Sequence, residues 1–100
     1  MKNIIAKKTL KAHWEKRGRK DSEQPLKAWY HEALIAEWRN PNDVKKQFAS
    51  ASVIGDNRIV FNICGNKYRL IVQINYLTQW VFIRFVGTHA EYDKIDASTI

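Results

Sequence analysis

The fold is decided by residues 58–86, which read RIVFNICGNKYRLIVQINYLTQWVFIRFV. Three runs rich in Ile, Val, Phe and Tyr stand between short polar segments, at residues 58–63, 67–75 and 80–86. This pattern predicts three strands, and connections this short join antiparallel neighbours. The middle run alternates between apolar and polar side chains, with Ile71 as the exception. The last run is apolar on both faces apart from Arg84, which is typical of a central strand.

The segment before this meander predicts a short strand and a first helix. Residues 2–6 read as the strand. Thr9 is a possible N-cap for a helix that runs to about Arg17 and is ended by Gly18, because glycine readily adopts the backbone conformation that follows a helix.

A second helix is expected from Asp21, which together with Gln24 resembles a capping box. Its apolar side chains recur at helical spacing: Leu26, Trp29, Tyr30, Ala33 and Leu34. Asn40 precedes a proline and should end this helix, since the residue before a proline is disfavoured in the helical region. Asn42 or Asp43 is expected to cap one further turn, and residues 49–52 are expected to form a loop.

This order of elements predicts a single α+β domain over residues 1–100, in which the N-terminal strand and two helices pack on a twisted antiparallel sheet. The other sheet face is then available for a ligand. No apolar run is long enough to cross a bilayer, and the start is too weakly apolar for a signal peptide, which predicts a cytoplasmic protein. The single cysteine, Cys64, excludes an internal disulfide and a Cys-based zinc site.

The charge distribution indicates a polyanionic partner. The formal net charge is +7, and residues 1–20 hold eight of the 17 basic side chains but only one of the ten acidic ones. Such a block attracts nucleic acid, although it could also be a solvated helix face. A membrane surface is a weaker interpretation, because only Leu10 and Trp14 form an apolar stripe. The candidate RNA- or ribosome-binding residues in this block are Lys7, Lys8, Lys11, Lys16 and Arg17.

The chemistry that the chain can support is acid–base catalysis without a metal. His13, His31 and His89 have no histidine or cysteine neighbours at ligand spacing, and there is no glycine-rich phosphate loop or nucleophile elbow. RNA can be cut by such groups alone, because its 2′-hydroxyl is an internal nucleophile that needs a base, cations on the phosphate and an acid for the leaving oxygen.

Two clusters could supply these groups. The first surrounds the hairpin between the first two meander strands and contains Asn62, Asn66, Lys67 and Arg69. The Arg69 guanidinium can contact two phosphate oxygens, although it could equally be a surface arginine paired with an acid. The second cluster contains Arg84, His89, Glu91, Tyr92 and Asp93. His89 suits proton transfer near neutral pH, while a lone histidine is more often structural.

These residues carry a resemblance to the HigB branch of the RelE toxin superfamily. Three stretches carry it, RIVFNI at 58–63, GNKYRLI at 65–71 and FIRFVGTHAEYD at 82–93, and the two-helix front half matches in layout. The resemblance implies a RelE-like fold and a type II toxin that cuts messenger RNA on the ribosome without a cofactor. It also implies neutralisation by a helix-turn-helix antitoxin of the HigA type, operator DNA being bound only through that antitoxin, and docking of the basic helix on 16S ribosomal RNA.

The resemblance also implies roles for single residues. Arg69 corresponds to the sheet arginine that family members place on the scissile phosphate, and residues 89–93 correspond to the C-terminal segment that supplies basic or aromatic groups. RelE itself uses lysines and arginines with a late tyrosine, whereas this chain has His89 and Tyr92. We therefore expect His89 to act as base and Tyr92 to orient or stack. Further site candidates are Arg84, Lys67, Asn66 and Asp93.

Two other hypotheses stay open at this point. A non-catalytic RNA- or ribosome-binding module would use the same basic block, and its binding would weaken steeply with salt. An interaction protein without an RNA role would have its basic helix covered by an acidic partner.

Overall fold

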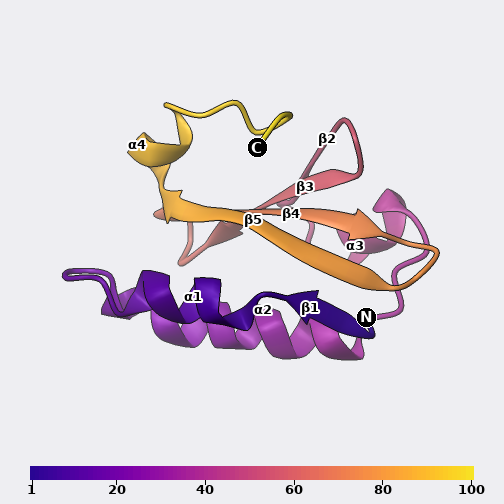
Figure 1. Cartoon of the computed structure of the whole chain (residues 1–100), viewed down its shortest axis with the longest axis horizontal. Helices are drawn as coiled ribbons and strands as arrows, with labels where there is room; N and C mark the ends of the chain where they lie inside the picture. The colour runs from indigo at the N-terminus through magenta and orange to yellow at the C-terminus, as the bar shows by residue number, and fades with distance from the viewer.

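The computed structural model describes all 100 residues and contains one sheet with the strand order β1-β5-β4-β3-β2 (Figure 1). The strands are β1 (Asn3–Ile5), β2 (Ser52–Ile54), β3 (Arg58–Ile63), β4 (Tyr68–Asn75) and β5 (Trp80–Thr88). The helices are α1 (Lys7–Trp14), α2 (Glu23–Ile35), α3 (Pro41–Gln47) and α4 (His89–Tyr92), with a 3₁₀ turn, η1 (Lys20–Ser22), before α2. The predicted α+β class is confirmed.

The three long strands form the predicted antiparallel meander, and β1 and β2 extend it at opposite edges. β1 pairs with β5 in parallel, whereas β2 pairs antiparallel with β3. The β4–β5 register shifts between Ile71 and Val72. Ile71 lies opposite Phe85 and Val72 lies opposite Ile83, which leaves Arg84 as an extra residue on β5. Such a bulge bends the strand and changes the direction of the unpaired side chain.

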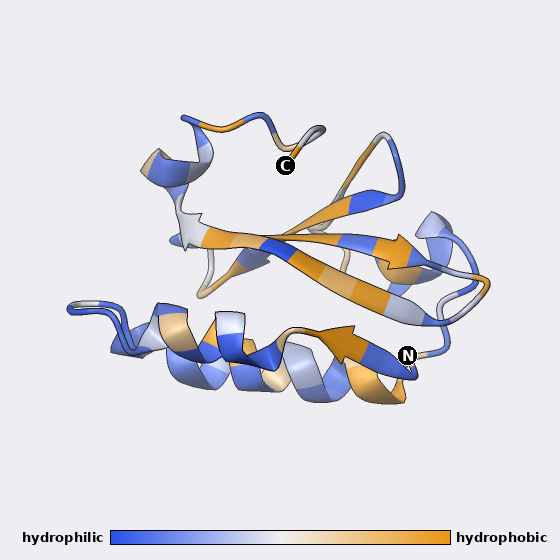
Figure 2. Ribbon diagram, viewed as in Figure 1, coloured by the Kyte–Doolittle hydropathy of each residue, from blue (hydrophilic) through white to orange (hydrophobic).

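One face of the sheet packs against α1 and α2 and forms the core (Figure 1). Trp29 of α2 meets Phe61 of β3 edge to face, with ring centroids 5.4 Å apart, and Leu70 of β4 is completely buried. Burial of each such side chain stabilises the fold by roughly 1.5–3 kcal/mol. Figure 2 shows the sequence pattern behind this packing. Hydrophobic residues concentrate along the strands, whereas many residues of α1 and α2 are hydrophilic.

The opposite face of the sheet, called the outer face below, carries Arg69 and Gln73 of β4 and Phe82 of β5, because their neighbours in sequence point into the core. α4 and the C-terminal segment lie on this side of the sheet (Figure 1). The segment contacts β3 where Arg58 Nη2 donates to the Ile100 carbonyl oxygen at 2.8 Å. No helix has both the length and the apolar character needed to span a membrane.

The structure corrects the predicted start of both long helices. α1 begins at Lys7 after Ala6, which makes no side-chain cap, so Thr9 lies inside the helix rather than at its N-cap. The expected capping box at Asp21 is also absent, since α2 begins at Glu23 without a side-chain cap. Asp21 instead accepts hydrogen bonds from Lys67 and Tyr68 of the sheet, and such charge-assisted bonds outweigh a local cap.

The structure also corrects the end of α2 and the segment that follows. α2 ends at Ile35 rather than near Asn40, because an extended connection carries Trp38 into the core, where it is 2% exposed. Asn40 is the cap of α3 in place of Asn42 or Asp43, and its side chain accepts from the Asp43 backbone N–H at 3.0 Å. The expected loop at residues 49–52 runs into β2, a strand too short to show alternation.

Candidate functional site

Arg69 stands at the centre of a cluster on the outer face, called the Arg69 cluster below. It lies opposite Gly87 in the β4–β5 ladder, and its guanidinium carbon is 5.9 Å from the centroid of the Tyr92 ring on α4. Its hydrogen bonds leave from Nη1, to the carbonyl oxygens of Asn66 at 3.2 Å and Tyr68 at 3.5 Å. Nη2 and Nε therefore keep their N–H groups for an anionic ligand, and a guanidinium fork matches two phosphate oxygens.

The position of α4 is fixed by its cap and by close packing at Gly87. The Thr88 hydroxyl accepts from the Glu91 backbone N–H at 3.1 Å, and the Glu91 carboxylate accepts from the Thr88 N–H at 2.9 Å, which completes a capping box. A Cβ at Gly87 would lie 2.6 Å from the Phe85 ring and 2.7 Å from the Glu91 carboxylate. A larger residue at this position would therefore force the Phe85 ring and the Glu91 carboxylate to shift.

His89 begins α4 beside the β3–β4 hairpin and joins the same cluster. Its backbone N–H donates to the Lys67 carbonyl oxygen at 3.2 Å, which brings it next to the base of the hairpin. Its ring Nδ1 lies 3.2 Å from the Asp93 carboxylate, and both side chains are at least half exposed. With the carboxylate beside Nδ1, Nε2 on the other side of the ring stays open to a ligand.

Arg19 links this cluster to the basic N-terminal region across 72 residues of sequence. Its Nη1 and Nη2 donate to Oε1 and Oε2 of Glu91 at 2.9 and 3.0 Å, a two-pronged ion pair. Arg19, together with the Thr88 backbone N–H, lowers the pKa of Glu91 to about 2. The carboxylate that caps α4 therefore stays ionised in neutral solution.

We expect Arg19→Met to loosen α4 without unfolding the domain. A pair with one partner 42% exposed is screened by solvent and contributes about 1 kcal/mol, so opening of α4 should increase roughly fivefold. Hydrogen exchange of the Asp93 amide, which donates to the His89 carbonyl, measures this opening. The matched control is Arg17→Met, in the same turn and without contact to Glu91. Equal exchange in the two variants would contradict the role of the ion pair.

Arg84, which was expected in the catalytic cluster, lies elsewhere on the outer face. Its Nη2 donates to Gln73 Oε1 at 2.7 Å, and its guanidinium carbon is 5.6 Å from the centroid of the Phe82 ring. Gln73 is four residues from Arg69 along β4, or about 13 Å at the strand rise. The structure thus brings Arg69 against Tyr92, places His89 at the start of the same short helix, and leaves Arg84 in a second group.

Lys67 and Asn66 take part in the site less directly than expected. Lys67 Nζ contacts the Asp21 carboxylate at 2.5 Å, and this bond lowers the pKa of Asp21 and raises that of Lys67. The Tyr68 hydroxyl donates to the same carboxylate at 2.6 Å. The ion pair of Lys67 with Asp21 thus joins the β3–β4 hairpin to η1. The backbone carbonyl of Asn66, and not its side chain, accepts a hydrogen bond from Arg69.

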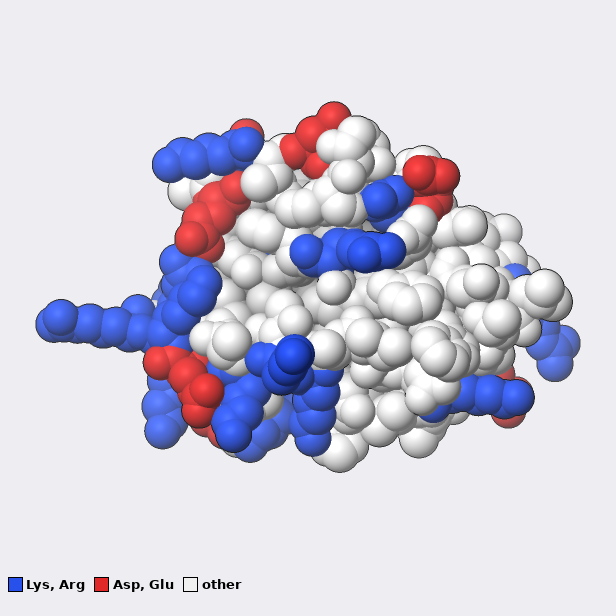
Figure 3. Space-filling model, viewed as in Figure 1, with Lys and Arg blue, Asp and Glu red and all other residues white.

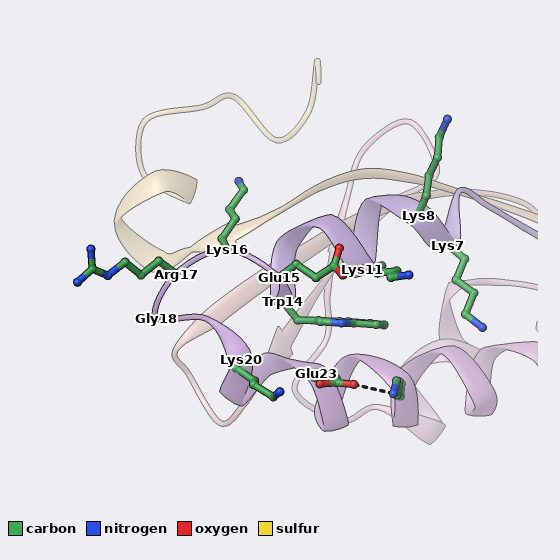
Figure 4. Close-up of a pocket in the computed structure, with 11 residues that line it drawn as sticks. Lys7, Lys8, Lys11, Trp14, Glu15, Lys16, Arg17, Gly18, Lys20 and Glu23 are labelled. Carbon is green, nitrogen blue, oxygen red and sulfur yellow. Dashed lines mark hydrogen bonds and ion pairs between the residues drawn. The ribbon is translucent and has the colours of Figure 1, made fainter.

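The basic block forms one wall of an open groove of about 1060 Å³, called the basic groove below (Figure 4). All five predicted cations line it, and Trp14 is its one hydrophobic lining residue. Lys20, Lys27, Gly18 and two carboxylates, Glu15 and Glu23, complete the lining, so cations outnumber acids seven to two. Figure 3 shows the same concentration of Lys and Arg at the end of the molecule formed by α1 and the turn after it. A groove rich in lysines suits a chain of phosphates.

Comparison with known proteins identifies the family. A model of HigB_toxin, described as the RelE-like toxic component of a toxin-antitoxin system, matches residues 22–95. The chain is also 31% identical over 97 residues to the mRNA interferase toxin HigB of Escherichia coli (strain K12), covering 95% of this chain and 91% of the relative. The mRNA interferase HigB of Shigella flexneri matches with the same identity and coverage. The chain belongs to the HigB toxin family.

The HigB family model covers the whole Arg69 cluster, whereas α1 and its lysines lie outside the matched range. The resemblance to the HigB branch found in the sequence is confirmed.

Sequence reasoning missed three contributors to these surfaces. Lys20 and Lys27 are seven residues apart, two helical turns, and this spacing could have placed them on one face beside the first helix. No local pattern predicts the contact of Arg19 with Glu91, because it depends on how α4 folds back over the sheet.

Proposed function

We propose that this HigB family member is an endoribonuclease that cuts messenger RNA on the ribosome. The observation that carries the proposal is that the Arg69 guanidinium lies over the ring of Tyr92 on the short helix that His89 begins. The name mRNA interferase, printed for the relatives, supports the same activity. The alternative, a non-catalytic binding module, would account for the arginine and the ring but gives no reason for the imidazole paired with Asp93.

In the proposed reaction the 2′-hydroxyl of the RNA is the nucleophile and no metal takes part. His89 Nε2 accepts the 2′-hydroxyl proton, with Asp93 holding the ring, and the 2′-oxygen attacks phosphorus. Arg69 stabilises the charge on the crowded phosphate, and the Tyr92 ring orients the arginine or stacks on a base. The bond from phosphorus to the 5′-oxygen breaks, this oxygen takes up a proton from solvent, and His89 returns the proton that it accepted to solvent. The products are a 2′,3′-cyclic phosphate and a 5′-hydroxyl.

The same proposal assigns the other surfaces. The basic groove binds 16S ribosomal RNA and brings the Arg69 cluster to messenger RNA in the cytoplasm. An antitoxin of the HigA type, a helix-turn-helix protein, neutralises the toxin and binds the operator DNA of the pair. The net charge of +7, concentrated at one end, supports a polyanionic docking partner.

Purified protein and a translating ribosome with a defined messenger RNA test this function. We expect new 5′ ends inside the translated region, absent when the RNA is offered without ribosomes. These ends should be 5′-hydroxyls that a kinase labels without prior phosphatase treatment. A 2′-deoxy substitution at the cleaved nucleotide should abolish the cut, because it removes the nucleophile. Ribosome binding without new ends would instead establish the binding module.

A further inference from the structure

A second group of side chains on the outer face lies outside the Arg69 cluster, and we call it the aromatic group. It consists of Trp80, Phe82 and Arg84 on β5. The rings of Trp80 and Phe82 have centroids 6.0 Å apart and are tilted by 40°, and Arg84 lies over the Phe82 ring. Trp80 is 36% exposed, whereas the other three tryptophans are at most 9% exposed.

The core does not require these side chains. Val81 and Ile83, which alternate with them on β5, provide the contacts to the helices, and Val81 is completely buried. A large indole left exposed on the outer face, beside a second ring and a cation, is an uncommon arrangement for a protein surface. It is therefore a candidate for binding.

Beside the aromatic group is a pocket of about 420 Å³. Its lining combines the Phe82 ring with three amide side chains, Asn57, Gln73 and Asn75. Gln73 is held in place by Arg84, which donates to its Oε1, and its Nε2 donates to the Asp56 carbonyl at 3.3 Å. No charged side chain lines the pocket itself, and Arg84 is connected to it through Gln73.

We propose that the aromatic group and this pocket bind a nucleobase of the messenger RNA near the cleaved nucleotide. This inference rests on the proposed function and adds a subsite to it. The Trp80 and Phe82 rings provide a surface on which a base stacks, and Arg84 binds the adjoining phosphate. The amides of the pocket can both donate and accept hydrogen bonds with a base edge. Arg84 is thus a binding residue and not a catalytic one.

The geometry favours RNA over a protein partner. The subsite lies on the same face as Arg69, about 13 Å away along β4, so one extended strand can reach both. Aromatic rings next to a guanidinium are the usual means by which proteins hold unpaired bases. Figure 3 shows that acidic side chains do not surround the area over β5 and the β4–β5 hairpin, so a polyanion can approach.

Tryptophan fluorescence with an uncleavable RNA tests the subsite. The probe is a short single-stranded RNA with 2′-O-methyl riboses, added to the full chain. We expect quenching of the indole emission in the wild type and in Trp14→Phe, and its loss in Trp80→Phe, because Trp80 stacks on the base while Trp14 lies in the basic groove. Trp80→Ala should weaken binding of the RNA about tenfold, the usual effect of losing one stacking partner.

The outcomes separate the subsite from the proposed function. Quenching that persists in Trp80→Phe and disappears in Trp14→Phe would overturn the subsite, since the RNA would then occupy the basic groove. Absence of quenching in the wild type would overturn it as well, even if messenger RNA is still cut. Trp80-dependent quenching by a protein that does not cut translated messenger RNA would support the subsite and overturn the proposed nuclease.

A second measurement uses cleavage itself. Gln73→Ala should redistribute the cut sites among codons, because it removes an amide that contacts the base, and sequencing of the 5′ ends records this. A purely structural role would lower all cuts in proportion and would overturn base recognition by Gln73. Gln24→Ala, an exposed glutamine of α2 outside the pocket, is the matched control.

Discussion

Replacement of Arg69 by alanine is expected to lower the rate of RNA cleavage about 100-fold or more, the usual effect of removing a donor that stabilises transition-state charge. Its Nη1 donates to two backbone carbonyls and its guanidinium lies over the Tyr92 ring, which leaves the Nη2 and Nε donors for the proposed phosphate. The fold should survive, because the side chain is not part of the core. Single-turnover cleavage on programmed ribosomes measures the rate.

The controls for Arg69→Ala separate charge, geometry and docking. Arg69→Lys keeps the charge but loses the fork, and should recover only part of the rate. Arg39→Ala removes an arginine from the connection between α2 and α3 and should leave the rate unchanged. Ribosome binding by Arg69→Ala should stay near the wild-type value, since the basic groove is intact. Cleavage by a folded Arg69→Ala protein at the wild-type rate would refute this role for Arg69.

The three long strands were predictable because each is a run rich in Ile, Val, Phe and Tyr between short polar segments, and β4 also carries the period of two. Residues 58–63 were predicted with the observed bounds, and β4 and β5 differ by a few residues. Three-residue β2 shows no such pattern and takes its conformation from pairing with β3. The end of α2 was wrong because it was placed at Asn40 by the proline that follows, whereas the helix stops at Ile35 and Trp38 reaches the core from extended backbone.

The part of the site that the β3–β4 hairpin and the pairing of β4 with β5 determine was predictable from the sequence. Arg69 and the start of α4 meet because β4 and β5 are antiparallel neighbours. Arg84 was grouped with His89 by closeness in sequence, but the bulge on β5 gives it other contacts, and no sequence pattern predicts a bulge there. Trp80 and Phe82 share a face by simple alternation, yet only the packed structure shows that this face is exposed.

Acidification is expected to destabilise the domain through His13, a buried histidine of α1. His13 is 1% exposed, and its Nδ1 lies 3.0 Å from the Ser22 hydroxyl oxygen. That hydroxyl donates to the Arg19 carbonyl at 2.6 Å, so it must accept from His13 Nδ1–H. Nε2 then carries the lone pair and has no hydrogen-bond partner. A proton added there would be buried without an acceptor.

Burial is the main cause that lowers the pKa of His13 from 6.5 to about 4, and nearby Arg19 and Lys16 add to it while Glu91 and Asp21 oppose it. Since the pKa is lower in the folded state, the unfolded chain takes up the proton first. The contribution of neutral His13 to the free energy of unfolding is therefore fully present above pH 6.5. It decreases as the pH falls from 6.5 to about 4, and titration of His13 causes no further loss below that pH. The loss amounts to about 3 kcal/mol, at about 1.4 kcal/mol per pH unit.

Urea unfolding of the wild type and His13→Gln at several pH values between 4 and 7 measures this loss. The glutamine amide can still donate to Ser22 but does not titrate, so its stability should depend much less on pH in this range. The carboxyl groups with lowered pKa, such as Glu91, are common to both proteins, and the difference between the two curves isolates His13. Parallel curves would mean that the imidazole is protonated in the folded state at no cost, which would require an acceptor or a water at Nε2. If the stability of the wild type falls more steeply with acid than that of His13→Gln, His13 is a buried neutral residue. Its bond to Ser22, which in turn bonds the Arg19 carbonyl, would then be lost as the protonated ring leaves its buried position. Acid would thereby weaken both the core and the position of Arg19, which pairs with Glu91 of α4.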